Sequence, residues 1–161
     1  MPAVTTSYAK NIVRRAFSEL VDPSPTRKEQ AKIWDYFGDC CAYCGCPLRR
    51  GAKEGHIDHL VSASQGGANA LGNRVLSCAP CNEKEKLDRP WEEFLRAKAN
   101  TSKKLLSRRQ RILDWQQSHP VLKSHKNKAL ISIAQVHANK VVEFFDQAVA
   151  QVRPKADRDS E

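Results

Sequence analysis

The spacing of apolar residues predicts two helices near the start of the chain. Apolar side chains at every fourth position predict a helix over residues 8–20. Thr26 followed three residues later by Glu29 is the pattern of a capping box, so a second helix is expected to begin there. Gly38 is a natural terminator of this second helix, because glycine readily adopts the left-handed backbone conformation that ends helices.

Three more helices are predicted in the second half of the chain. One begins near Pro80 and continues through Leu95, and another covers residues 102–117. The polar tail over residues 153–161 is expected to be disordered. The last helix is long and amphipathic, with one stripe of residues at helical spacing: Leu130, Ile133, His137, Val141, Phe144, Ala148 and Val152.

The irregular part of the fold is confined to the middle of the chain. All seven glycines lie between Gly38 and Gly72, and the six cysteines lie between Cys40 and Cys81. Glycine marks tight turns, so short strands and turns are expected over residues 40–77, between helical flanks. The sequence therefore predicts an α+β fold that is predominantly α.

Net charge is the compositional feature that points to a partner. The 161 residues carry a formal charge of +9, and the chain has no apolar run long enough to cross a membrane. Between Arg96 and Lys128 there are ten basic residues and one acidic residue, which accounts for the whole net charge. Such a block favours a polyanion such as nucleic acid, although a solvated helix face would give the same pattern.

Two C-x-x-C pairs predict a zinc site. Cys41 and Cys44 form the first pair, and Cys78 and Cys81 form the second. The sequence starts without the pattern of a secretory signal, so a reducing cytosol and metal binding are expected rather than disulfides. Four thiolates would enclose a structural Zn²⁺, and unpaired thiols or disulfides are the alternative. The remaining cysteines are expected to be packing residues: Cys40 and Cys46.

The segment between the cysteine pairs carries a recognisable order of polar residues. Asp58-His59 is followed by a Gly-Gly loop, and Asn73 precedes an apolar strand that ends in C-x-x-C-Asn82. This order resembles the HNH endonucleases over about residues 27–95. The resemblance implies a ββα-metal core braced by the four-cysteine zinc site.

The same resemblance suggests how the chain is organised. The HNH nuclease domain with its zinc is expected over residues 26–99, after an N-terminal helical extension over residues 1–25. A basic helical region is expected over residues 100–152. The protein is expected to act in the cytoplasm of a bacterium, or to be encoded by a phage.

The resemblance implies a role for each polar residue of the motif. His59 would be the general base that takes a proton from the attacking water. Asp58 and Asn82 would hold a catalytic Mg²⁺ or Mn²⁺, for which hard oxygen ligands are suited. Asn73 would orient the His59 ring through a hydrogen bond. Together these roles describe one-metal phosphodiester hydrolysis.

Strand geometry sets a condition on this scheme. Neighbouring residues of a strand point to opposite faces, so Asp58 and His59 converge only if the strand ends or bulges there. A loop that starts near Ser62 makes such convergence feasible. Taken separately, Asn73 could be a turn residue and Asn82 a helix cap, but their joint order favours the nuclease interpretation.

Positions beside the motif leave alternatives open. His56 shares a strand face with Asp58, and it either joins the metal site or packs beside it. Glu85 stands where the family commonly has a lysine, and Lys84 and Lys86 flank it. Either Lys86 has taken over the phosphate contact, or Glu85 enters the metal shell, or the phosphate is held more weakly.

The C-terminal helices suggest how a nucleic acid is held. Lys104, Arg108 and Arg111 share one predicted helix face that ends in Trp115, and this face could follow a DNA backbone in a salt-dependent way. The alternative is a solvated surface with Trp115 in the core. His137 is expected to be a packed core or interface residue, and its stripe either covers the monomer or forms a homodimer.

These features together predict a metal-dependent DNA endonuclease, a hydrolase whose expected context is restriction or defence. The alternative is a zinc-braced DNA-binding module without cleavage activity. RNA is a second possible substrate, because a basic face does not distinguish the two nucleic acids.

Overall fold

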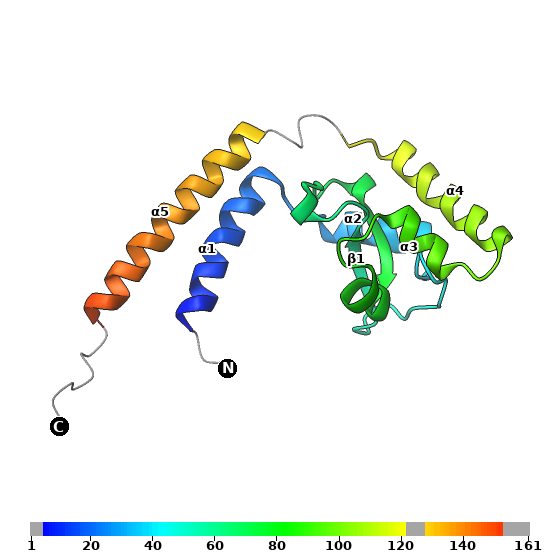
Figure 1. Ribbon diagram of the computed structural model, residues 1–161, viewed down its shortest axis with the longest axis horizontal. Coiled ribbons are helices and arrows are strands. Elements are labelled where there is room, and N and C mark those ends of the chain that lie inside the picture. The colour runs from blue at the N-terminus through cyan, green and yellow to red at the C-terminus, as the bar shows by residue number, and fades with distance from the viewer. Residues whose placement is uncertain (1–4, 122–127, 153–161) are drawn as a thin grey trace, which may run out of the picture. The chain divides into compact units, whose positions relative to one another are not determined.

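The computed structural model describes residues 5–121 and 128–152 (Figure 1). Contacts divide the chain into two compact units, one formed by residues 22–121 and the other by the first and last helices. The helix over residues 102–118 belongs to the first of these units, together with the segment expected to form the nuclease domain, and the domain boundaries expected from the sequence stay predictions.

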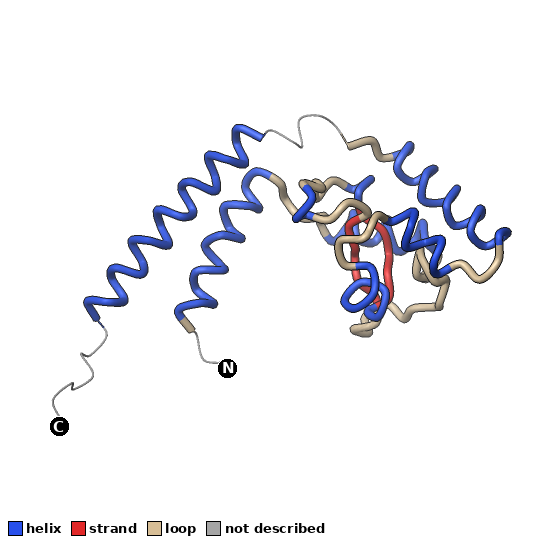
Figure 2. The backbone as a smooth tube through the Cα atoms, in the orientation of Figure 1, coloured by secondary structure: helices blue, strands red, loops and turns tan. Residues whose placement is uncertain are grey.

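A small antiparallel hairpin is the centre of the first unit (Figure 2). Strand β1 (Gly55–His59) pairs with β2 (Arg74–Cys78), with His59 opposite Arg74. The connection contains two short 3₁₀ turns, η1 (Ala63–Gln65) and η2 (Leu71–Asn73). A two-stranded sheet among helices confirms the predicted α+β class.

Helices α2 (Arg27–Phe37) and α4 (Ser102–Ser118) complete the core of this unit. The capping box of Thr26 and Glu29 is formed, and Gly38 ends α2 in the left-handed conformation, as predicted. The core gathers apolar side chains from both helices and from the sheet: Ile33, Phe37, Leu76, Ile112 and Trp115. Burying large apolar side chains supplies most of the free energy that holds such a unit together.

The helix predicted from Pro80 through Leu95 is wrong in one respect, because it consists of two pieces. The first piece, η3 (Pro80–Lys86), is wound as a π-helix, and the second is α3 (Trp91–Lys98). Pro90 explains the break, since proline lacks an N–H and its ring clashes with the carbonyl four residues before it. The chain leaves η3 through Leu87, which has a positive φ of 48°.

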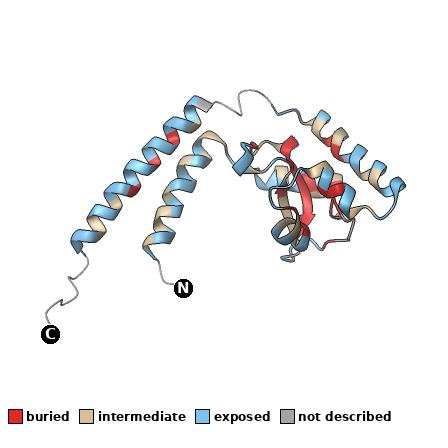
Figure 3. Cartoon of the chain, viewed as in Figure 1, coloured by how far each residue is buried: buried red, intermediate tan, exposed pale blue. Residues whose placement is uncertain are grey.

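The second unit pairs α1 (Thr6–Val21) with α5 (Lys128–Val152). Three small side chains of α5 are buried in this unit: Ala134, Ala138 and Val142 (Figure 3). Lys10 of α1 forms an ion pair of 3.0 Å with Asp146 of α5. The stripe predicted from the sequence lies mainly on exposed positions, and His137 is exposed, so it is not a core residue; the interface alternative stays a prediction.

Two further expectations concern the ends of the chain and the membrane. The tail over residues 153–161 lies outside the described residues. In the described part, none of the helices combines the length and the apolar character that crossing a membrane requires.

Candidate functional site

A cluster of thiols lies where the first turn after α2 meets the end of β2. The Sγ atoms of Cys41, Cys44, Cys46 and Cys78 all lie within 4.8 Å of one another. With Zn–S bonds of about 2.3 Å, the sulfurs of a tetrahedral zinc site are about 3.8 Å apart. The Cys44 and Cys78 sulfurs are 3.7 Å apart, so the cluster fits a zinc ion.

Cys81 lies against the same cluster. It is buried, and hydrogen bonds with the Cys41 and Cys44 thiols raise the pKa of its own thiol. Five thiols therefore surround the site, one more than a tetrahedral shell takes. Cys46 was expected to be a packing residue, whereas its thiol lies in this cluster. We call the turn that carries Cys41 and Cys44 the first knuckle and the turn that carries Cys78 and Cys81 the second. When bound, zinc would cross-link the two knuckles and leave no position for a reacting water.

Helix α4 fastens the first knuckle. Gly45 has a φ of 74°, a left-handed conformation that side chains other than glycine rarely adopt. The Arg108 guanidinium lies against it, where an added Cβ would come within 2.3 Å of an arginine nitrogen. Arg108 also donates a hydrogen bond of 2.9 Å to the carbonyl oxygen of Tyr43. This arginine is therefore an internal contact of the fold.

The ring of His59 is held at both nitrogens. Its Nε2 lies 3.0 Å from Asn69 Oδ1, and its Nδ1 lies 3.0 Å from a guanidinium nitrogen of Arg74. Burial of the ring, followed by the charge of Arg74, lowers the pKa of His59. Both effects favour the neutral imidazole, which is the form that a general base requires.

Asn73 does not orient the His59 ring, in contrast to the prediction. Its side chain accepts a hydrogen bond from the Val61 amide at 2.9 Å and donates to the carbonyl oxygens of Val61 and Ala68. It therefore ties together the two ends of the loop that follows β1. The neighbours of the ring are Asn69 and Arg74, which we did not single out from the sequence.

Asp58 faces away from His59. Its Oδ2 accepts a hydrogen bond of 2.9 Å from the Tyr43 hydroxyl and lies 3.3 Å from Lys86 Nζ. Since β1 continues regularly through His59, the two side chains point to opposite faces of the hairpin. The convergence of both residues on one phosphate is therefore not seen.

Asn82 and His56 meet on the same side of the hairpin as Asp58. Asn82 Nδ2 is 3.4 Å from His56 Nδ1, and His56 Nε2 is 3.5 Å from a carboxylate oxygen of Glu83. A divalent cation shared by Asp58 and Asn82 would have to displace the Lys86 ammonium. As packed here these residues do not fit that ion, and the Mg²⁺ or Mn²⁺ site stays a prediction.

Several residues expected at or near the phosphate have partners within the protein. Lys86 is only 1% exposed, and besides Asp58 it contacts the His59 carbonyl oxygen at 2.6 Å. Glu85 pairs with Lys98 of α3. Arg111 donates to the Tyr36 carbonyl oxygen and lies over the rings of Tyr36 and Phe37.

The aromatic end of the predicted basic face is also internal. Trp115 is 2% exposed, and its indole donates to the carbonyl oxygens of Leu71 and Arg74. Three of the predicted phosphate contacts are exposed: Lys84, Lys104 and Arg111.

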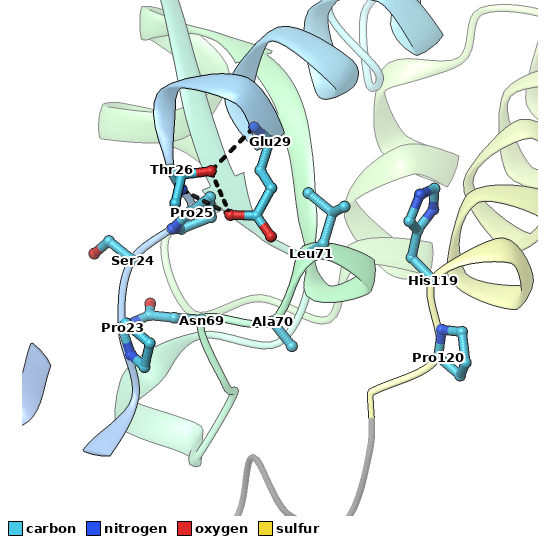
Figure 4. Close-up of a pocket in the computed structure, with 10 residues that line it drawn as sticks. All are labelled: Pro23, Ser24, Pro25, Thr26, Glu29, Asn69, Ala70, Leu71, His119 and Pro120. Atoms are coloured by element: carbon cyan, nitrogen blue, oxygen red, sulfur yellow. Dashed lines mark hydrogen bonds between the residues drawn. The ribbon is translucent and has the colours of Figure 1, made fainter. Parts of the chain in front are cut away.

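A pocket of about 460 Å³ opens beside Asn69. Pro23, Ser24 and Pro25 line one side of it, and His119 and Pro120 line another (Figure 4). Glu29, which also lines this pocket, is engaged in the capping box with Thr26. The pocket therefore has mainly apolar walls around the outer side of the Asn69 loop.

Two comparisons with known proteins bear on this segment. A search of curated proteins found no match to the chain. Residues 41–87, which include the thiol cluster, the hairpin and η3, match the family model described as HNH endonuclease.

Proposed function

We propose that this protein is an endonuclease that hydrolyses phosphodiester bonds in DNA, with His59 as the general base. The hydrogen bonding of His59 inside the matched HNH segment is the observation that carries this proposal. The ring is oriented at Nε2, and Nδ1 can exchange its Arg74 contact for the attacking water. A general base of this kind contributes about 10²–10⁴-fold to the rate.

The other groups of the chain support the reaction by holding His59 in place. Asn73 closes the loop that follows β1, and zinc would brace the two knuckles on either side of the hairpin. A divalent cation, Mg²⁺ or Mn²⁺, would supply charge stabilisation at the phosphate when bound. Asp58 and Asn82 lie on the other face of the hairpin from His59 and do not fit that ion as packed here, so no step of the proposal depends on them.

Plasmid cleavage tests the proposal. The zinc-loaded full-length protein is incubated with supercoiled DNA in Mg²⁺, in Mn²⁺ or in EDTA, and nicked and linear products are measured. His59→Ala should lower the rate by about 10²–10⁴-fold while zinc content and circular dichroism stay unchanged. Asn100→Ala is the control, because Asn100 is exposed and lies outside both the proposed site and α5, and it should cleave at the rate of the parent protein.

A DNA-binding module without cleavage is the second candidate. The observation that favours it is the Lys86 ammonium at Asp58, where the catalytic cation was expected to bind. This candidate predicts salt-dependent DNA binding with no product in either metal. Cleavage of RNA alone would reassign the substrate, so both nucleic acids belong in the assay.

A homodimer and a role in restriction or defence complete the proposal. One active site cuts one strand, so two copies would allow both strands of a duplex to be cut. The exposed apolar side chains of α5, which include Ile133 and Phe144, are a surface for such an association. Sedimentation of the full-length protein tests it, and linear rather than nicked plasmid as the first product would support it.

A further inference from the structure

A chain of hydrogen bonds connects His59 to a residue outside the matched HNH segment. Asn69 lies between His59 and Asp22, and Asp22 precedes α2. The backbone amide of Asn69 donates to both carboxylate oxygens of Asp22, at 3.0 and 2.9 Å. The side-chain amide nitrogen of Asn69 also donates to the Asp22 carbonyl oxygen, at 2.5 Å. Asp22 therefore holds both the backbone and the side chain of Asn69.

These contacts fix which way the Asn69 amide faces. A carbonyl oxygen only accepts hydrogen bonds, so the atom near the Asp22 carbonyl must be the amide nitrogen. A guanidinium only donates, so the atom that contacts Arg74 must be the amide oxygen. Both neighbours require the same orientation. A flipped amide would place its nitrogen against the Arg74 guanidinium, which only donates, and its oxygen against the Asp22 carbonyl oxygen, which only accepts.

The orientation of Asn69 in turn fixes the proton on His59. Because Asn69 Oδ1 accepts, the Nε2 atom that faces it at 3.0 Å must carry the hydrogen. Arg74 donates to Nδ1 at 3.0 Å, so Nδ1 must carry the lone pair. The neutral ring is therefore held as a single tautomer.

We propose that Asn69 and Asp22 are positioning residues that set the tautomer and the ring orientation of His59, leaving Nδ1 as the basic atom. The role rests on the proposed function of His59 as general base. Asp22 is suited to it because Pro23 and Pro25 restrict the backbone that follows it. This proline segment lines the same pocket as Asn69 (Figure 4).

Nitrogen NMR of His59 tests the proposal without requiring cleavage. Long-range ¹H–¹⁵N spectra of the zinc-loaded protein distinguish the two neutral tautomers, and His59→Gln assigns the signals. The parent protein should show Nε2–H with an unprotonated Nδ1. Asn69→Leu removes both the acceptor for Nε2 and the oxygen that holds the Arg74 guanidinium beside Nδ1, so it should give a mixture of tautomers. Asn69→Asp keeps an acceptor at this position and should retain Nε2–H.

Two more variants complete the design. Asp22→Ala removes the carboxylate but leaves its carbonyl oxygen, so the shift in tautomer should be smaller than in Asn69→Leu. Asn100→Leu is the control, because Asn100 is exposed, and it should leave the His59 signals unchanged. An Nδ1–H ring in the parent protein, or an unchanged spectrum in folded Asn69→Leu, would overturn the proposal.

Kinetics provide the second measurement. Asn69→Leu should lower kcat about 10–100-fold, as loss of a supporting contact typically does, with KM within about twofold of the parent value. Asn69→Asp should recover most of the rate. An increase confined to KM would contradict a positioning role. Absence of cleavage in the parent protein would refute the proposed function, whereas the tautomer would still be decided by the spectra.

Discussion

Replacing Lys86 by methionine separates two roles that this lysine could have. Lys86 is 1% exposed, and its ammonium contacts Asp58 Oδ2 at 3.3 Å and the His59 carbonyl oxygen at 2.6 Å. Methionine fills a similar volume, so Lys86→Met chiefly removes the charge and its hydrogen bonds. A residue that binds DNA phosphate would instead be on the surface.

The expected loss of stability follows from these contacts. Removing one partner of a buried ion pair typically costs about 3–5 kcal/mol, because the other charge stays buried without compensation. Tyr43 continues to donate to the Asp58 carboxylate at 2.9 Å, which reduces the penalty. We therefore expect Lys86→Met to lower the free energy of unfolding by about 3 kcal/mol, a large part of a typical total of about 5–15 kcal/mol.

Urea unfolding of the zinc-loaded protein gives the measurement, with Lys84→Met as matched control. Lys84 is an exposed neighbour in η3, and its replacement should change stability by less than about 0.5 kcal/mol. Asp58→Asn combined with Lys86→Met should recover part of the lost stability, because the uncompensated charge is then gone. If Lys86→Met unfolds like the parent protein but binds DNA with a weaker salt dependence, the lysine contacts phosphate and the reasoning fails.

Three further predictions concern the metal, the knuckle and pH. Cys46→Ser and Cys81→Ser should each retain one zinc per chain, because either thiol can complete the shell, and the double variant should lose the zinc. The zinc content after gel filtration is the measurement. Loss of zinc in Cys81→Ser but not in Cys46→Ser would assign the four ligands expected from the sequence. Gly45→Ala should lower the free energy of unfolding by about 1–2 kcal/mol, because alanine must adopt a φ of 74°; equal urea midpoints would contradict this. Burial lowers the pKa of His59 in the folded protein below its usual value of about 6.5. Between these two values the unfolded state binds more protons, so the free energy of unfolding should fall as the pH decreases through this window. His59→Gln should reduce this dependence of stability on pH, and parallel stability curves for the two proteins would refute the prediction.

Most of the helices and the gathering of the cysteines could be predicted because they depend on neighbours in the sequence. The capping box of Thr26 and Glu29 and the apolar spacing of α1 and α4 involve residues three or four positions apart, which is the range of helical contacts. The cysteine pairs are similarly local. The position of the Cys46 thiol beside this cluster could not be predicted in the same way, because Cys46 lies outside the C-x-x-C spacing.

The partners of the polar residues could not be predicted, since they depend on which strand face each residue occupies. Strand alternation indicated that Asp58 and His59 point apart, but the partners that each would meet come from distant segments. Asn69 belongs to the Gly-Gly loop, and only the fold brings Asp22 to it. The basic spacing of α4 likewise gave no sign that Arg108 and Arg111 would fold back on the core.

The winding of η3 explains how one short helix serves both the thiol cluster and Asp58. Its two buried residues, Cys81 and Lys86, are five positions apart. In an α-helix this separation would place them about 140° apart around the axis, so only one could face the interior. A π-helix bonds each residue to the fifth one along, so both side chains fall on the same side. Cys81 can then reach the thiols while Lys86 reaches Asp58. The unusual winding thus links the zinc cluster to the buried ion pair beneath His59.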